Sequence, residues 1–210
     1  HPNMATMLGF ITTDAAIPRA ALQRALVRAV NQSFNRISVD GDMSTNDTVI
    51  LLANGVAGSV PMPAFQDALD YVCRELAHMI VRDGEGVSKF VTINIHGAAS
   101  DRDAEIAGRA VANSVLVKTS WCGGDPNWGR IMDALGYSRA KVTEELVDIS
   151  YDGLPAVREG EPTRTQLKKL KAVVTQPAFT IDIHLHLGRG HCTMTTCDLT
   201  EKYVTLNKGE

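Results

Sequence analysis

The 210-residue sequence lacks any long hydrophobic run. Its longest apolar stretch, at about residues 49–53, is far below the roughly 18 residues that a bilayer-spanning helix needs, and the amino terminus carries no signal-peptide pattern. The sequence also lacks a strong charge of one sign: its net charge is -3 and its pI about 6.1, which argues against nucleic acid and polybasic membrane contacts. We therefore expect a small neutral or zwitterionic ligand.

Cysteine is scarce and unpatterned. The four cysteines are Cys73, Cys122, Cys192 and Cys197, and they form neither a Cys-x-x-Cys pair nor a dense framework. This usage is typical of a reducing compartment. We expect four free thiols, most of them buried.

The composition that remains is that of an ordinary globular protein, 44% hydrophobic and 21% charged, with enough chain for one sizeable core. Apolar residues recur at helical spacing over residues 18–34 and 63–81. Ser100 with Asp103 resembles a capping box for a helix through Val117, and Asp125 with Pro126 would begin another helix. Residues 159–171 predict a loop and a short exposed helix.

Strands are expected between these helices. Residues 7–11 predict a short buried strand, and residues 48–53 and 90–96 predict two more. In the last third, residues 147–151, 179–187 and 192–197 alternate apolar and polar, which predicts half-exposed antiparallel strands joined by turns such as Gly188-Arg189-Gly190. The expected fold is α/β (α+β), with mixed or antiparallel sheets covered by helices in a sandwich-like arrangement.

Thr6 stands where a small-residue segment meets the first apolar run, at the mouth of a predicted strand. A threonine hydroxyl is a weak nucleophile and needs a base, and no His or Asp is close in sequence. A free α-amino group on Thr6 itself could serve, since such groups titrate near 7.7–8.0. That amine exists only if the Ala5-Thr6 bond is cut.

The sequence resembles the ornithine acetyltransferase (glutamate N-acetyltransferase) family. The residues around Ala5-Thr6, with Thr12-Thr13-Asp14-Ala15, are similar to the self-cleavage region of that family. Further similar blocks follow in the same order at residues 40–48, 83–89, 117–119, 125–130 and 197–200. The resemblance covers nearly the whole chain and corresponds to the carboxy-terminal, or β, part of the family precursor, so an α part of the same precursor is missing from this sequence.

The resemblance implies an activity and a set of site residues. After cleavage between Ala5 and Thr6, the threonine would carry an acetyl group from N2-acetylornithine to glutamate in a ping-pong sequence of arginine biosynthesis, without a cofactor. Glu85 and Asn207 would contact substrate. From the residues themselves, Asn127, Trp128 and Arg130 form either a capped turn anchored by the tryptophan or a wall of the site. Acetyl-CoA as a second donor stays open, because no phosphate-cradling motif decides it. The family pattern continues beyond Asn207 to a hydroxyl-bearing last residue, whereas this chain ends in Lys208-Gly209-Glu210.

The resemblance also implies an organisation. Residues 1–5 would end the α part, residues 6–135 would form the catalytic α/β region, and residues 136–210 an antiparallel β-rich region. The oxyanion hole and a substrate-binding lysine would lie on the α part, so this chain should not work alone. Two α and two β chains in the cytoplasm, or in the mitochondrial matrix of a fungus, are expected.

Two other classes stay open from the residues alone. A threonine with a free amine could instead pass its acyl group to water, as in an N-terminal-nucleophile amidase, or accept another acyl donor in secondary metabolism. His184, His186, His191, Cys192 and Cys197 also lie close in sequence and could form a zinc or iron site. The strand face of His184 and His186 also carries Thr180 and Asp182, a solvent-facing pattern, so we expect no metal.

Overall fold

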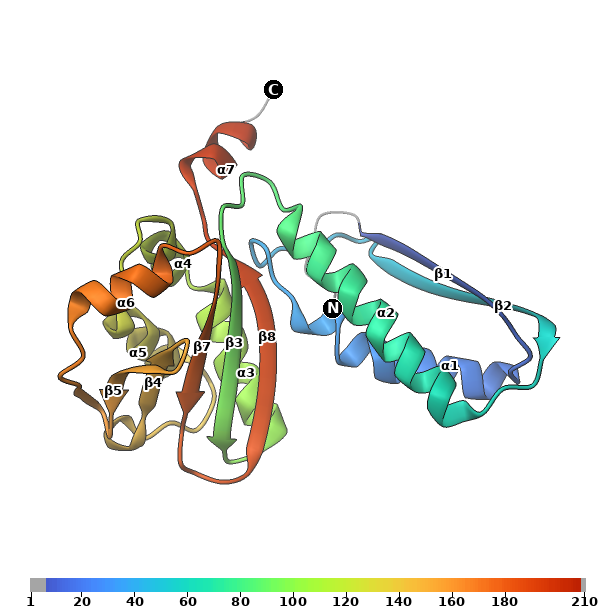
Figure 1. Ribbon diagram of the computed structural model, residues 1–210, viewed down its shortest axis with the longest axis horizontal. Coiled ribbons are helices and arrows are strands. Elements are labelled where there is room, and N and C mark those ends of the chain that lie inside the picture. The colour runs from blue at the N-terminus through green and yellow to red at the C-terminus, as the bar shows by residue number, and fades with distance from the viewer. Residues whose placement is uncertain (1–6, 209–210) are drawn as a thin grey trace. The chain divides into compact units, whose positions relative to one another are not determined.

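The computed structural model describes residues 7–208 and divides the chain into two compact units, His1–Ile80 and Val81–Glu210 (Figure 1). The first unit contains β1 (Leu8–Ala15), α1 (Arg19–Asn31), the 3-10 turn η1 (Phe34–Arg36), β2 (Thr48–Gly58) and α2 (Met62–Arg82), which ends just past the boundary. The predicted boundary after residue 135 lies inside the second unit. The division into regions of different function stays a prediction.

The first unit is a two-stranded parallel sheet with two helices along one side (Figure 1). β1 and β2 pair in register, with Phe10 opposite Ile50. The helices are held together by the Gln66 amide, which donates to the carbonyl of Ala25 at 3.2 Å, and by an ion pair between Arg28 and Asp70 at 3.3 Å. Small side chains of both helices are buried, among them Ala25, Ala29, Cys73 and Ala77.

The other side of this sheet is apolar and exposed, which corrects the prediction of a short buried strand at residues 7–11. β1 is longer than predicted, and the exposed fractions of Leu8, Phe10 and Leu52 are 57%, 64% and 55%. We define this outer face as Leu8, Phe10, Ile50 and Leu52. A hydrophobic run does not reveal how many sides of its sheet a single chain covers, so the sequence could not show that only one side is covered here.

The second unit is built on a six-stranded mixed sheet in the order β6-β5-β4-β7-β3-β8. Its strands are β3 (Phe90–Ala98), β4 (Asp148–Tyr151), β5 (Leu154–Arg158), β6 (Glu161–Pro162), β7 (Ala178–His184) and β8 (Gly190–Cys197). Its helices are α3 (Asp101–Asn113), α4 (Val115–Cys122), α5 (Trp128–Tyr137), the 3-10 turn η2 (Glu144–Leu146), α6 (Leu167–Val174) and α7 (Glu201–Leu206). The predicted mixed α/β class is confirmed.

The two faces of the central strands differ in polarity. Ile93, Ile95, Ile181 and Ile183 are fully buried in one core cluster with Ala107 and Val111 of α3. The opposite face carries a polar row in which the Asn94 amide donates to Asp182 at 2.9 Å and Thr193 donates to Asn94 at 2.8 Å. Alternation along each strand therefore buries one row of side chains and leaves the next row polar.

The predicted link between β7 and β8 is wrong. β3 lies between them, parallel to β7 and antiparallel to β8, so residues 188–190 do not close a hairpin. The apolar row of β3 is fully buried. The backbone N–H and C=O groups of a buried strand need partners, and a position in the middle of a sheet supplies them on both edges. The antiparallel pairing of β4 with β7 is as predicted.

Two helix boundaries also differ from the prediction. The helix that begins at the Ser100 cap ends at Asn113, and Ser114 caps a separate helix α4 by accepting from the Val117 amide at 3.3 Å. The cap of α5 is Asn127, which accepts from the Arg130 amide, rather than Asp125. In both cases a side chain that accepts from a backbone amide, Ser114 or Asn127, begins a helix at a position that was not predicted.

None of the helices in the described part of the chain is both long and apolar enough to cross a membrane. The four cysteines are free thiols, and all but Cys122 are buried, as predicted. Burial, reinforced by the Asp70 carboxylate, raises the pKa of Cys73 to about 11, so this thiol is protonated at neutral pH and chemically inert.

Candidate functional site

Ala5 and Thr6, the predicted cleavage site and nucleophile, lie outside the described residues. The described residues begin at Met7. This side chain is 7% exposed, and both the amide and the carbonyl of its backbone are hydrogen-bonded. Its amide donates to Asp47 at 2.7 Å, and its carbonyl accepts from the Thr48 amide at 2.8 Å. The Asp47 carboxylate also accepts from the backbone and the hydroxyl of Ser44. The polar loop at residues 40–48 therefore anchors the residue that directly follows Thr6 in the sequence.

Glu85 and Asn207, the two predicted substrate contacts, meet in the second unit. They are 122 positions apart in the sequence, and the Asn207 amide donates to a Glu85 carboxylate oxygen at 2.7 Å. Both side chains are exposed. Asn207 is also the residue that ends α7, and its side chain donates to the carbonyl of Tyr203 at 3.0 Å. Because Glu85 and Tyr203 accept from the two N–H groups of the Asn207 amide, the Glu85 carboxylate and the Asn207 amide oxygen are the atoms that can accept from an ammonium group of a ligand.

The loop that carries Glu85 is clamped to the start of α7. Thr200 caps α7 by accepting from the Tyr203 amide at 3.2 Å, and its hydroxyl donates to the carbonyl of Gly86 at 2.7 Å. Gly86 has φ +68°, and a Cβ at this position would lie 2.6 Å from the backbone nitrogen of Tyr203. Only glycine allows the two segments to approach this closely.

Asp198 fixes the other end of the same loop. It is 2% exposed, and its carboxylate accepts from the Ser88 amide at 2.9 Å, the Ser88 hydroxyl at 2.5 Å and the Lys89 amide at 2.9 Å. In the sequence, Asp198 is part of the family-like block Cys197-Asp198-Leu199-Thr200, and no role was predicted for it. That block is the one signal that could have identified it.

Lys118 is a second buried charge next to this segment, and sequence reasoning missed its role as well. It is 2% exposed, and its Nζ donates to the Thr196 hydroxyl at 2.9 Å and to the carbonyl of Cys197. A buried ammonium is tolerated only when it is hydrogen-bonded. Lys118 therefore ties α4 to the end of β8, directly before Asp198.

Asn127, Trp128 and Arg130 have contacts of their own at the junction of α4 and α5. Asn127 caps α5 and donates to Asp125 at 3.1 Å, and Trp128 packs against the core. Arg130 donates to the carbonyl of Leu116 at 2.6 Å. Among residues 81–208 no hydrogen bond joins these three side chains to Glu85 or Asn207. Their place as a wall of the site stays a prediction.

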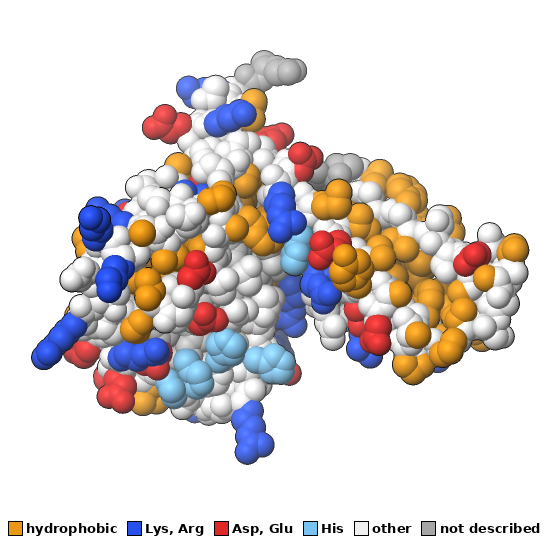
Figure 2. Space-filling view, viewed as in Figure 1, with side chains coloured by type: hydrophobic (Ala, Val, Ile, Leu, Met, Phe, Trp, Pro, Cys, Tyr) orange, Lys and Arg blue, Asp and Glu red, His pale blue; other side chains and the backbone are white. Residues whose placement is uncertain are grey.

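Two of the histidines considered as metal ligands, His184 and His186, form a surface cluster with His96 instead, and His191 lies apart from it (Figure 2). The rings of His184 and His186 lie with their centroids 3.7 Å apart and are tilted by 35° to one another, and His96 stacks on His184 at 6.3 Å. His186 Nε2 lies 3.1 Å from Asp148 and His96 Nε2 3.6 Å from Asp182. Within the described residues no three His, Cys, Asp or Glu side chains are placed to hold a metal ion.

The histidine cluster makes the stability of the second unit depend on pH. Burial, followed by the neighbouring His186 and His96, lowers the pKa of His184, with Arg158 acting in the same direction and Asp148 opposing it. A histidine whose folded pKa is lowered binds its proton more readily when the chain is unfolded, so stability is complete above about pH 6.5 and falls as the pH drops. Asp148 acts in the same direction at lower pH: burial tends to raise its pKa, but the Glu159 amide and His186 outweigh burial and lower it overall.

We therefore expect the thermal midpoint to fall more steeply between pH 7 and pH 5 in the parent protein than in His184→Gln. Differential scanning fluorimetry at several pH values measures the slope. His191→Gln is the matched control, because His191 lies outside the cluster, beside Asp101. Equal slopes for His184→Gln and the parent protein would contradict the prediction.

Comparison with known proteins gives consistent matches. Residues 1–209 match the ArgJ family. The chain is 44% identical, over 99% of its length, to the arginine biosynthesis bifunctional protein ArgJ of Bacillus licheniformis, and 46% identical, over 98%, to the glutamate N-acetyltransferase of Methanocaldococcus jannaschii. It covers 53% and 54% of those proteins, so it spans about half the length of the curated relatives it matches.

A solved structure agrees with these matches. The crystal structure of the arginine biosynthesis bifunctional protein ArgJ from Bacillus halodurans superposes on this chain with a TM-score of 0.93 at 40% identity. The match covers 98% of this chain and 100% of the solved chain. The curated relatives are thus matched over half their length, whereas the solved chain is matched from end to end.

Proposed function

Because the chain belongs to the ArgJ family, we propose that it is the threonine-bearing half of an acetyltransferase that moves an acetyl group from N2-acetylornithine to glutamate in arginine biosynthesis. The observation that carries this proposal is the contact between Glu85 and Asn207. The family resemblance implies that both residues contact substrate, and they lie within hydrogen-bond distance although 122 positions separate them. Chance alone would rarely bring together two such distant positions.

The proposed chemistry begins with cleavage of the Ala5-Thr6 bond, which frees the amine of Thr6. This amine takes the proton of the Thr6 hydroxyl while the oxygen attacks the acetyl carbonyl of N2-acetylornithine. The amide bond breaks, the nitrogen leaves with a proton as the free amine of ornithine, and the acetyl group stays on Thr6 as an ester. The amine of glutamate then attacks this ester and restores the hydroxyl. The β-branched side chain restricts χ1, which helps to position the oxygen.

Glu85 and Asn207 suit the recognition of an amino acid substrate. N2-acetylornithine carries one free amino group, and the Glu85 carboxylate with the Asn207 amide oxygen supplies acceptors for the ammonium form of that group. The clamp formed by Gly86, Thr200 and Asp198 holds the Glu85 loop against α7, so the pair is positioned before substrate arrives.

We expect Glu85→Gln to raise the KM for N-acetylornithine by about 10- to 100-fold, because the substitution removes one charge-assisted hydrogen bond and keeps the shape of the side chain. Steady-state kinetics of the complete protein measures the change. Glu161→Gln on β6 is the matched control, since this glutamate is also exposed and should leave KM unchanged. If Glu85→Gln behaves like Glu161→Gln, Glu85 is not a substrate contact.

Hydrolysis is the alternative to transfer, because a threonine ester also reacts with water. The test is an assay of the complete two-part protein with N-acetylornithine, with and without glutamate. Ornithine release that requires glutamate, together with formation of N-acetylglutamate, supports transfer. Equal release without glutamate would favour an amidohydrolase and overturn the proposal.

The partner in this proposal is the other half of the precursor, and the outer face of the β1–β2 sheet is the surface it would cover. Parallel sheets are almost always covered on both faces, and an isolated pair of strands is marginally stable. Figure 2 shows hydrophobic side chains gathered over the first unit. The chain spans about half of its curated relatives, so a partner of similar size is available within the same protein. The end-to-end match with the solved chain supports a separate chain of this extent.

A double substitution of Phe10→Asp with Leu52→Asp should therefore prevent co-purification of the two halves when both are expressed together. Each charge would have to be buried without a partner, at a cost of several kcal/mol. Leu167→Asp on α6 is the control, because Leu167 is equally exposed, at 57%, and lies in the other unit. Unchanged assembly of the double variant, judged by size-exclusion chromatography, would show that another surface binds the partner.

A further inference from the structure

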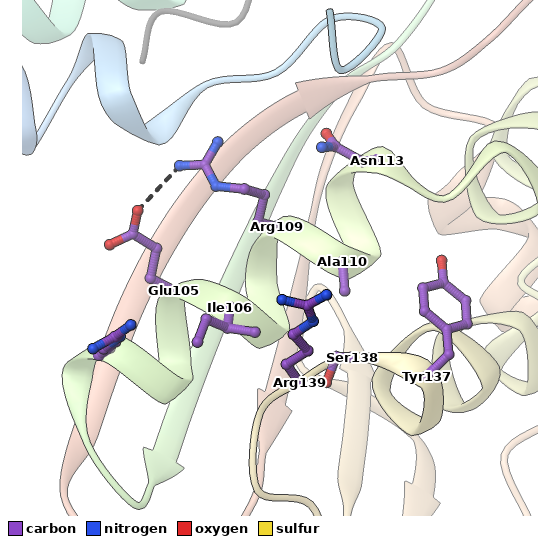
Figure 3. Close-up of a pocket in the computed structure, with 9 residues that line it drawn as sticks. Glu105, Ile106, Arg109, Ala110, Asn113, Tyr137, Ser138 and Arg139 are labelled. Atoms are coloured by element: carbon purple, nitrogen blue, oxygen red, sulfur yellow. Dashed lines mark hydrogen bonds and ion pairs between the residues drawn. The ribbon is translucent and has the colours of Figure 1, made fainter.

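A pocket of about 690 Å³ lies between α3 and the end of α5, and the proposed function makes no use of it. Arg102, Glu105, Ile106 and Arg109 line it from α3, and Tyr137 and Arg139 line it from the end of α5 and the turn that follows (Figure 3). All of these residues belong to the second unit. The volume is within the usual range of sites for small molecules.

The pocket is positively charged although the chain as a whole is not. Its three arginines outnumber its single glutamate, which leaves two positive charges in a chain whose net charge is -3. Glu105 is committed to Arg109, at 3.1 Å. Within residues 7–208 Arg102 and Arg139 form no ion pair. A guanidinium that has no ion-pair partner can bind a carboxylate or a phosphate through two parallel hydrogen bonds.

The arginines are spaced along an apolar floor. Arg102 and Arg109 are seven positions apart on α3, which corresponds to about 10 Å along a helix axis. Ile106 and Ala110 line the pocket from the same stripe of α3, and the Tyr137 side chain, which is 60% exposed, stands at the end of α5. Figure 3 shows Arg139 reaching toward this stripe from the segment after α5. The pocket thus offers separated anion anchors with apolar contact between them.

We propose that this pocket binds a small dianion, a molecule with carboxylate or phosphate groups at both ends of a short apolar body. The two groups would pair with Arg102 and Arg139, and the body would lie on Ile106 and Ala110. A small molecule fits better than a segment of another protein, because two elements of the same unit form the walls and three arginines line one cavity. The proposal does not depend on the acetyl-transfer reaction.

The test is isothermal titration calorimetry on the complete two-part protein, with glutarate as the dicarboxylate probe and pyrophosphate as the phosphate probe. We expect saturable binding of at least one probe, and the preferred probe identifies the class of anion. Arg102→Gln combined with Arg139→Gln should weaken binding by at least about 100-fold, since each charge-assisted contact contributes about tenfold or more. Ala110→Phe, which fills the pocket without changing charge, should also abolish binding.

Arg164→Gln is the matched control, because Arg164 is exposed and outside the pocket. The control should bind like the parent protein. Absence of saturable binding by both probes would overturn the proposal, and so would binding that survives both pocket variants. If the double arginine variant instead separates the two halves of the protein, the surface is a protein interface and the proposal is wrong. Because calorimetry measures no turnover, failure here is distinct from failure of the proposed reaction.

Discussion

Replacing Thr6 with alanine is expected to reduce acetyl transfer by roughly 10⁴-fold or more, because the substitution removes the atom that would carry the acetyl group. In enzymes that form a covalent intermediate, removing the nucleophile alone lowers the rate by this factor or more. The same change should also leave the precursor uncut, since the threonine hydroxyl would attack the Ala5-Thr6 bond. Intact mass spectrometry reports cleavage, and glutamate-dependent release of ornithine reports transfer.

Two further variants make this result specific to Thr6. Thr6→Ser keeps a hydroxyl and should retain both cleavage and measurable transfer. Thr12→Ala removes an exposed hydroxyl from β1 and should change neither. A transferring preparation that remains continuous from Ala5 to Thr6, or a Thr6→Ala protein with unchanged turnover, would refute the mechanism.

The helices were the most predictable part of the fold, for a physical reason. In α1 and α2 the apolar residues repeat at helical spacing over several turns, so a local pattern is enough to define each helix. The Ser100 cap of α3 is likewise local. The order of strands is not local: β3 is hydrogen-bonded to β7 and β8, which follow it by more than 80 positions, and no short-range pattern in the sequence encodes that choice.

The residues of the candidate site also differ in whether the sequence could predict their roles. Glu85 and Asn207 were selected through a family resemblance, which carries information about the folded protein that the residues alone do not contain. Asp198 was missed because a single aspartate after a strand most often belongs to a turn. Its role depends on Ser88 and Lys89, which are about 110 positions away in the sequence. Only the folded chain shows that this carboxylate holds the loop of Glu85.

The second large effect is therefore expected at Asp198. Asp198→Ala removes an acceptor from two backbone amides and one hydroxyl in a nearly buried place, and each donor left without a partner costs about 1–3 kcal/mol. Because Ser88 is exposed and water replaces part of the loss, we expect the free energy of unfolding to fall by about 2–4 kcal/mol. Urea denaturation measures this change.

Asp198→Asn keeps one carbonyl acceptor in the same shape and should lose less stability than Asp198→Ala, whereas Asp133→Ala, an exposed change on α5, should stay within about 0.5 kcal/mol of the parent protein. The effect of Asp198→Ala should also reach the site, because a released loop no longer presents Glu85 to Asn207. KM for N-acetylornithine should then rise at temperatures where the variant is still folded. If Asp198→Ala is as stable as Asp133→Ala, the carboxylate does not anchor this loop, and the positioning of Glu85 must come from the Thr200 clamp alone.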